Sequence, residues 1–103
     1  MSHTEEKRFV EGDLRWLIEN PTSSTTAGLT GYRKRIGPED LFSVYVIFSS
    51  RDAQTSHWQQ AKLFALAREM EERLPSVGEE FVLTSGLNPV AEIVIVSMGQ
   101  EVV

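Results

Sequence analysis

The spacing of apolar residues changes along the chain, and each change predicts an element. Residues 2–20 have the spacing of a helix, with Ser2-x-x-Glu5 or Thr4 as its N-terminal cap and Asn20-Pro21 as its end. At about 100° per residue, four apolar side chains form one stripe on this helix. They are Val10, Leu14, Leu17 and Ile18. We therefore expect this stripe to face the core.

Two large aromatic residues, Phe9 and Trp16, fall on the opposite side of that helix. One interpretation is that Gly12 delays the helix until about Asp13, so that Phe9 packs from a non-helical lead. The other is that Phe9 and Trp16 contact a partner or a second subunit. Trp16 is therefore a candidate partner-binding residue.

A hairpin is predicted next. Residues 21–31 lack periodicity and are rich in turn formers, which indicates a flexible surface loop. Residues 32–36 form a short charged strand that suits a sheet edge, and residues 37–40 form a turn. Residues 41–48 are an almost unbroken β-branched and aromatic run, which is typical of a central strand.

A second helix is predicted from the capping box Ser56-x-x-Gln59 to Leu74, where Pro75 ends it. Trp58 lies on its polar side, beside two alanines, and is a candidate anchor for a protein partner. The core stripe of this helix consists of Leu63, Phe64, Leu66, Ala67, Met70 and Leu74. We expect Leu66 and Met70 to be buried together with Val46 of the preceding strand.

Two more strands, residues 79–84 and 91–98, complete the chain. The predicted fold class is therefore α+β, with a single small two-layer domain over residues 1–103. Its element order is α-β-β-α-β-β, with a four-stranded mixed sheet. Because both faces of this sheet are apolar, we expect a homodimer or a higher oligomer.

Composition narrows the partners. The 103 residues carry 10 Lys and Arg against 15 Asp and Glu, a net charge of −5, and no cysteine. This charge opposes nucleic-acid binding, and the lack of cysteine excludes a disulfide scaffold, a thiolate nucleophile and Cys-ligated zinc. After residue 76 there are four Glu and no Lys or Arg, so Glu79 and Glu80 are expected to meet a basic partner. With no long apolar run, we expect a cytoplasmic protein that binds no membrane.

The candidate chemistry lies where the strand at residues 41–48 leads into the second helix. A helix N-terminus there could bind an anion or a small ligand. The residues in position for this are Ser50, Arg51, Ser56 and His57. No second metal ligand stands three or four residues after His57, and adjacent Ser56 and His57 cannot readily share a proton. We therefore expect no catalytic residues, no metal and no cofactor.

Two function classes follow. The first is a non-enzymatic protein-interaction domain, that is, a small acidic adaptor, chaperone or inhibitor that acts by surface complementarity. The alternative is a small-molecule-binding or anion-binding domain, or a minor enzyme, with its site around residues 49–57. A pocket beside Arg51 and His57 would favour the second class, and a flat apolar or acidic patch would favour the first.

Overall fold

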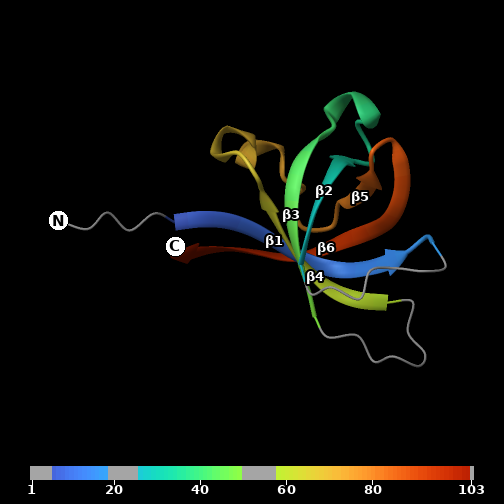
Figure 1. Cartoon of the computed structure of the whole chain (residues 1–103). Coiled ribbons are helices and arrows are strands. Elements are labelled where there is room, and N and C mark those ends of the chain that lie inside the picture. The colour runs from blue at the N-terminus through green and yellow to red at the C-terminus, as the bar shows by residue number, and fades with distance from the viewer. Residues whose placement is uncertain (1–5, 19–25, 50–57, 103) are drawn as a thin grey trace.

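Alternating inward and outward side chains build six antiparallel strands that close into a barrel (Figure 1). The computed structural model describes residues 6–18, 26–49 and 58–102. Around the barrel the strands run in the order β1-β4-β3-β2-β5-β6, and β6 pairs again with β1. The strands are β1 (Glu6–Trp16), β2 (Thr26–Arg33), β3 (Phe42–Phe48), β4 (Trp58–Ala65), β5 (Glu80–Ser85) and β6 (Asn88–Val102). The described connections also contain two 3-10 helices, η1 (Pro38–Asp40) and η2 (Arg68–Arg73).

The prediction of an α+β domain with a four-stranded mixed sheet is therefore wrong, and the first helix is a strand. In β1, Val10, Leu14 and Trp16 are all buried, and their even numbering places them on one face of a strand. Val10 and Leu14, four residues apart, satisfy a period of two as well as a period of 3.6, so they could not distinguish the two. Trp16 could have distinguished a strand from a helix, because it lies on the same face as Val10 and Leu14 only in a strand.

The second predicted helix is a strand over residues 58–65, and only Leu63 and Phe64 of its predicted core stripe lie in that strand. Ala61, Leu63 and Ala65 of β4 point into the barrel, while only Arg68–Arg73 coils, as η2. The expected burial of Leu66 beside Met70 and Val46 is wrong, because Leu66 is 60% exposed and Met70 only packs against the edge of the core. Residues 58–65 pair with β1 and β3 on their two sides, and these distant hydrogen bonds override the local helix propensity.

The predicted strands at residues 41–48, 79–84 and 91–98 are confirmed as β3, β5 and β6. The predicted loop at 21–31 is wrong from residue 26 onward, because β2 begins there and pairs with β3. The charged strand expected at 32–36 ends at Arg33 and continues as a turn. The last strand also continues past Met98 and ends only at Val102.

The barrel interior holds one apolar core, to which every strand contributes. Trp16 and Phe48 stack at a centroid distance of 5.3 Å, and Phe42 meets Phe81 edge to face at 5.7 Å. The largest fully buried apolar side chains include Val10, Leu14, Val44, Val46, Leu63, Phe81, Leu83, Ile93 and Ile95.

A second aromatic cluster lies on the outer face of the barrel. Phe9 and Phe64 are cross-strand partners with ring centroids 5.6 Å apart, and both are buried although they belong to the face opposite Val10 and Leu63. Gly99 of β6 stands opposite Phe9, where a Cβ would lie only 2.7 Å from the ring. Lys62 covers the Phe9 ring with Nζ at 4.4 Å from its centroid. This outer cluster fixes β6 to β1 and β4.

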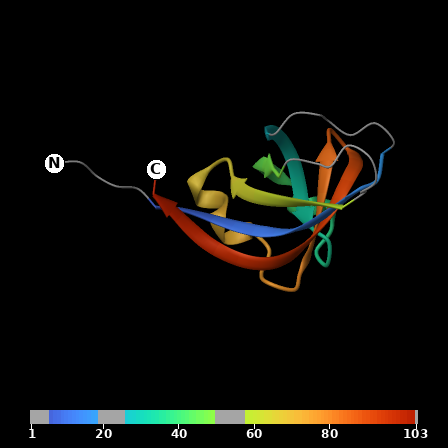
Figure 2. The same cartoon turned by 90° about the horizontal axis from the view of Figure 1, so that it is seen from below.

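Strands β1 and β6 extend beyond the barrel as a two-stranded ribbon. Strand β6 pairs with β5 only as far as Val94, whereas it pairs with β1 from Ala91 to Val102. Figures 1 and 2 show the two strands running side by side to their ends, away from the rest of the barrel. The molecule is elongated, with principal extents of 47 × 31 × 24 Å, and the projecting ribbon is consistent with this shape.

Gly12 lies at the irregularity where the β1–β6 register shifts, and a Cβ there would lie 2.1 Å from the Val94 carbonyl oxygen. We therefore predict that Gly12→Ala lowers the free energy of unfolding by about 1–3 kcal/mol. Gly28→Ala is the matched control, because no atom lies within 4 Å of the Cβ it would add. Urea denaturation of both variants checks this, and equal losses would contradict it.

Candidate functional site

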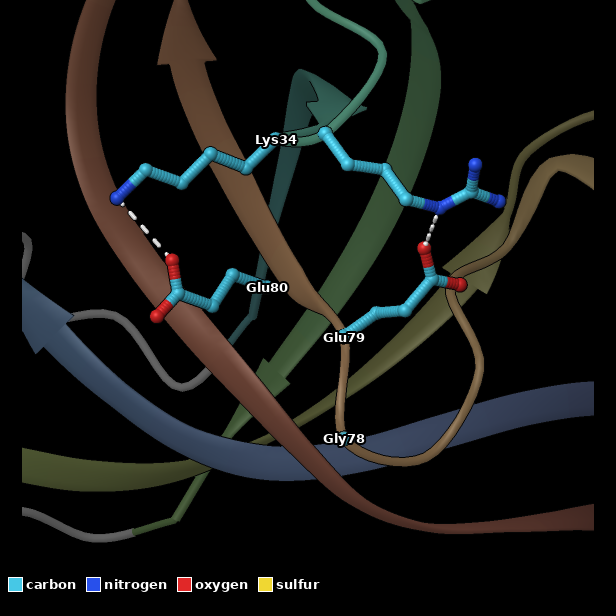
Figure 3. Close-up of a pocket in the computed structure, with 5 residues that line it drawn as sticks. Lys34, Gly78, Glu79 and Glu80 are labelled. Atoms are coloured by element: carbon cyan, nitrogen blue, oxygen red, sulfur yellow. Dashed lines mark hydrogen bonds and ion pairs between the residues drawn. The ribbon is translucent and has the colours of Figure 1, made fainter.

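A charged cleft of about 400 Å³ lies between the turn that follows β2 and the turn that precedes β5. Figure 3 shows Lys34 reaching across it to Glu80, with Gly78 and Glu79 on the opposite wall. Arg35 forms an ion pair with Glu79. The cleft thus contains two of the predicted partner-binding residues, Glu79 and Glu80.

Backbone hydrogen bonds hold the walls of this cleft in place. The Lys34 amide donates to the Glu80 carbonyl at 3.0 Å. The Gly78 amide donates to the Ile95 carbonyl at 2.8 Å, and the Ile95 amide donates to the Glu79 carbonyl at 3.0 Å. Gly78 has φ of 91°, a left-handed conformation that favours glycine in this tight turn. The acidic wall is therefore anchored to β6.

The carboxylates in and beside the cleft already have hydrogen-bond or ion-pair partners within the protein. The backbone N–H of Ser76 donates to Glu79 at 2.7 Å, and this bond, with help from Arg35, lowers the pKa of the Glu79 carboxyl. Hydrogen bonds from Lys34 and Arg15 lower the pKa of Glu92. Hydrogen bonds to Glu92 and Glu80 in turn raise the pKa of Lys34.

All four acidic residues after residue 76 have basic partners from other strands or turns. Arg35 pairs with Glu79, Lys34 bridges Glu80 and Glu92, and Lys62 pairs with Glu101. The charge excess in this segment of sequence is thus largely compensated in space. The cleft offers matched charges rather than an open acidic surface, so it contains no free cluster for a cation or an anion.

The other predicted site residues lie elsewhere. Trp16 is 7% exposed, and its Nε1–H donates to Gln59 Oε1 at 3.0 Å, which leaves little of the ring to meet a partner. Trp58 begins β4, so the helix on which it was placed does not exist. The anion or ligand residues Ser50, Arg51, Ser56 and His57 lie outside the described residues. That site was placed at the N-terminus of the second predicted helix. This helix is wrong, because residues 58–65 form strand β4 instead.

A second hollow, of about 270 Å³, lies over β2, β3 and the β5–β6 turn. Its hydroxyls satisfy one another, since Thr30 Oγ1 lies 2.6 Å from Thr84 Oγ1 and 3.2 Å from the Thr84 carbonyl. Within the ranges that the structure describes, no buried side-chain polar atom lacks a partner, and no group of three His, Cys, Asp or Glu could hold a metal. No helix in the same ranges is long and apolar enough to cross a membrane.

The feature that sequence reasoning missed is the open edge of β6, defined here as residues 96–102. Beyond Ile95, β6 pairs with β1 on one side, and no described strand pairs with it on the other. The sequence signal was the return of apolar residues at Met98 and Val102, on either side of polar Gln100, with no Pro or Lys in the segment. Its exposed apolar side chains are Val96 at 54%, Met98 at 45% and Val102 at 66%.

Hydrogen bonding fixes which backbone groups face outward on this open edge. The Arg8 amide donates to Glu71 Oε2 at 3.2 Å, so Arg8 turns its N–H away from its β6 partner, Gln100. In an antiparallel ladder both members of such a pair point away from each other, and the pattern repeats every second residue. The N–H and C=O groups of Gln100 and Met98 therefore point out of the open edge.

Comparison with known proteins gave no match: no protein-family model, no curated protein and no solved structure is similar to this chain.

The two neighbouring glutamates of the cleft should differ in importance for stability. Glu79→Gln removes the negative charge that strengthens the hydrogen bond from the Ser76 amide and that pairs with Arg35, and should lower the free energy of unfolding by about 1 kcal/mol. Glu80→Gln should change it little, because both Glu80 and Lys34 are about half exposed, at 48% and 50%. Urea denaturation at neutral pH distinguishes them, and a larger loss for Glu80→Gln would contradict this assignment.

Stability should also depend on acid pH. Arg33 donates two hydrogen bonds to buried Asp40, at 2.9 and 3.2 Å, and they lower the pKa of its carboxyl. A lowered pKa in the folded state means that the stabilisation is present above the unfolded value of about 3.9 and is lost as pH falls through the folded value. Asp40→Asn should therefore cost about 1–2 kcal/mol at neutral pH and flatten the decline below about pH 4. Parallel pH profiles for the two proteins would contradict this.

Proposed function

We propose that this chain is a non-enzymatic protein-interaction domain, of the adaptor, chaperone or inhibitor type, and that it binds by adding an extended segment to the open edge of β6. The observation that carries the proposal is this edge itself: seven residues with outward-facing backbone groups at Met98 and Gln100. In strand addition, backbone hydrogen bonds supply affinity and alternate side chains supply specificity. A cytoplasmic location is part of the proposal.

The proposal is supported by the contrast between the two edges of the ribbon. On the β1 edge, the carboxylate of Glu71 takes up the Arg8 amide, so that the end of this edge is capped by a side chain. On the β6 edge no described side chain does the same, and the segment contains none of the lysines or prolines that usually discourage strand pairing. Its one charged residue, Glu101, is paired with Lys62.

The edge is also held ready for binding. The Phe9 ring lies over Gly99, and Lys62 links the ribbon to β4 through Phe9 and Glu101. A preformed edge loses little conformational entropy on binding, which favours affinity from a short segment. The exposed side chains of Met98 and Val102, which lie on one face of the ribbon, favour a partner strand that places apolar residues on that face. The net charge of −5 speeds encounter with a basic segment and slows encounter with an acidic one, while the edge itself supplies the backbone hydrogen bonds for either.

A fluorescein-labelled peptide of six alternating valines and threonines, with two lysines at each end, provides a test by fluorescence anisotropy. We expect saturable binding, weakened at least about tenfold by Gln100→Pro, because proline removes an outward N–H without removing a β1–β6 hydrogen bond. Gln100→Thr retains the N–H and should change affinity by no more than about threefold.

The peptide measurement has clear opposing outcomes. Equal binding to the wild type and to Gln100→Pro would place the peptide elsewhere on the protein. No binding to any of the three proteins, each shown by thermal melting to be folded, would contradict strand addition as the function.

A further inference from the structure

We propose that the open edge of β6 pairs with the same edge of a second copy of this chain, antiparallel about a two-fold axis, so that the two ribbons form one continuous sheet. This inference rests on the proposed function, since it names the partner that fills the binding edge. It commits to an isologous dimer, in which the same surface serves both copies.

The sequence of the edge is self-complementary when the axis passes through Gly99. Met98 then stands opposite Gln100 of the other copy, and Ser97 opposite Glu101, while Val96, which the β1–β6 register shift leaves without a β1 partner, lies near Val102 at the end of the pairing. Apolar side chains therefore meet apolar or neutral ones, and the two Glu101 carboxylates do not face each other. Such matching cross-strand pairs stabilise a sheet, whereas like charges directly opposite destabilise it.

The hydrogen-bonding phase agrees with the same axis. Met98 and Gln100 both direct their backbone groups outward, so two symmetric Met98–Gln100 pairs would each exchange two hydrogen bonds across the interface. The two Gly99 residues would then form the close, non-hydrogen-bonded pair at the axis, with Cα atoms about 4.5 Å apart. Glycine suits this position, because the Phe9 ring already occupies the space beside it.

The overall charge gives this dimer a distinctive salt dependence. Each copy carries a net charge of −5, and the one charged residue of the edge is compensated by Lys62 within its own copy. Long-range repulsion between two such copies is screened by salt, so self-association should strengthen as ionic strength rises. Binding of a basic partner to the same protein would weaken under the same change, which separates the two occupants.

The interface is small. A strand pair of seven residues lies at the low end of stable interfaces, so we expect a dissociation constant on the order of 1–100 µM. Sedimentation equilibrium across this range should show a mass moving from 11.6 kDa towards twice that value. Raising NaCl from about 0.05 to about 0.5 M should tighten association severalfold.

Two variants and one spectroscopic measurement locate the contact. Gln100→Pro should weaken dimerisation at least about tenfold, whereas Gln100→Thr should change it by no more than about threefold. In a mixture of ¹³C-labelled and unlabelled chains, isotope-filtered nuclear Overhauser spectra should connect the Gly99 Hα protons of the two copies. That contact is expected only if the axis passes through Gly99.

The outcomes separate this inference from the proposed function. A chain that stays monomeric throughout the concentration range, or a dimer that Gln100→Pro does not weaken, would overturn the self-pairing. If such a chain still bound the valine–threonine peptide through β6, strand addition would stand with a different occupant. If it bound no peptide, both proposals would fail.

Discussion

Pairing between the first and last strands is the interaction on which the rest of this structure depends. Strand β1 has no sequence neighbour beside it, because its two partners are β4 and β6. The β1–β6 pairing thus brings together residues up to 96 positions apart, as in the pair of Glu6 with Val102 (102 − 6 = 96). Closure removes strand edges wherever a strand is paired on both sides. In the part of the chain that the structure describes, strand β2 keeps a short unpaired edge at residues 26–29, and β6 keeps a longer one where the β1–β6 pair continues past β5.

The outer aromatic cluster explains how that extra length stays ordered. A two-stranded ribbon alone is only marginally stable in water, so it needs further packing. Here Phe9 and Phe64 pack against each other across strands, and Lys62 covers Phe9 while pairing with Glu101. Gly99 leaves room for the Phe9 ring. The ribbon is thus attached to the barrel through its outer face, while its β6 side stays open among the described residues.

The charged cleft has a structural role that complements the ribbon. The turn carrying Gly78 and Glu79 makes backbone hydrogen bonds to Ile95, the last residue of β6 before its open edge. Ion pairs from Lys34 and Arg35 then neutralise the acidic side chains around that turn. The cleft therefore fixes the point at which pairing with β5 stops and the open edge begins. It connects the electrostatics of the molecule to the surface that we propose for binding.

Local sequence determined the strands whose residues alternate or are β-branched throughout, which are β3, β5 and most of β6. It also determined the net charge and the lack of cysteine. It did not determine β1 or β4, because Val10 and Leu14 fit either period, and residues 58–74 favour helix locally until β1 and β3 supply hydrogen bonds on both sides.

The site followed the same division. The sequence drew attention to Glu79 and Glu80, which line the charged cleft. Only the tertiary structure brought Arg35 and Lys34 to them and compensated their charge. The open edge could be suspected from the apolar residues Met98 and Val102 and from the lack of Pro and Lys around them, yet a strand edge exists only relative to its neighbours. Whether residues 96–102 were paired or open was decided by where β5 begins, at Glu80 opposite Val94, because backbone hydrogen bonds in sheets join segments that sequence proximity does not relate.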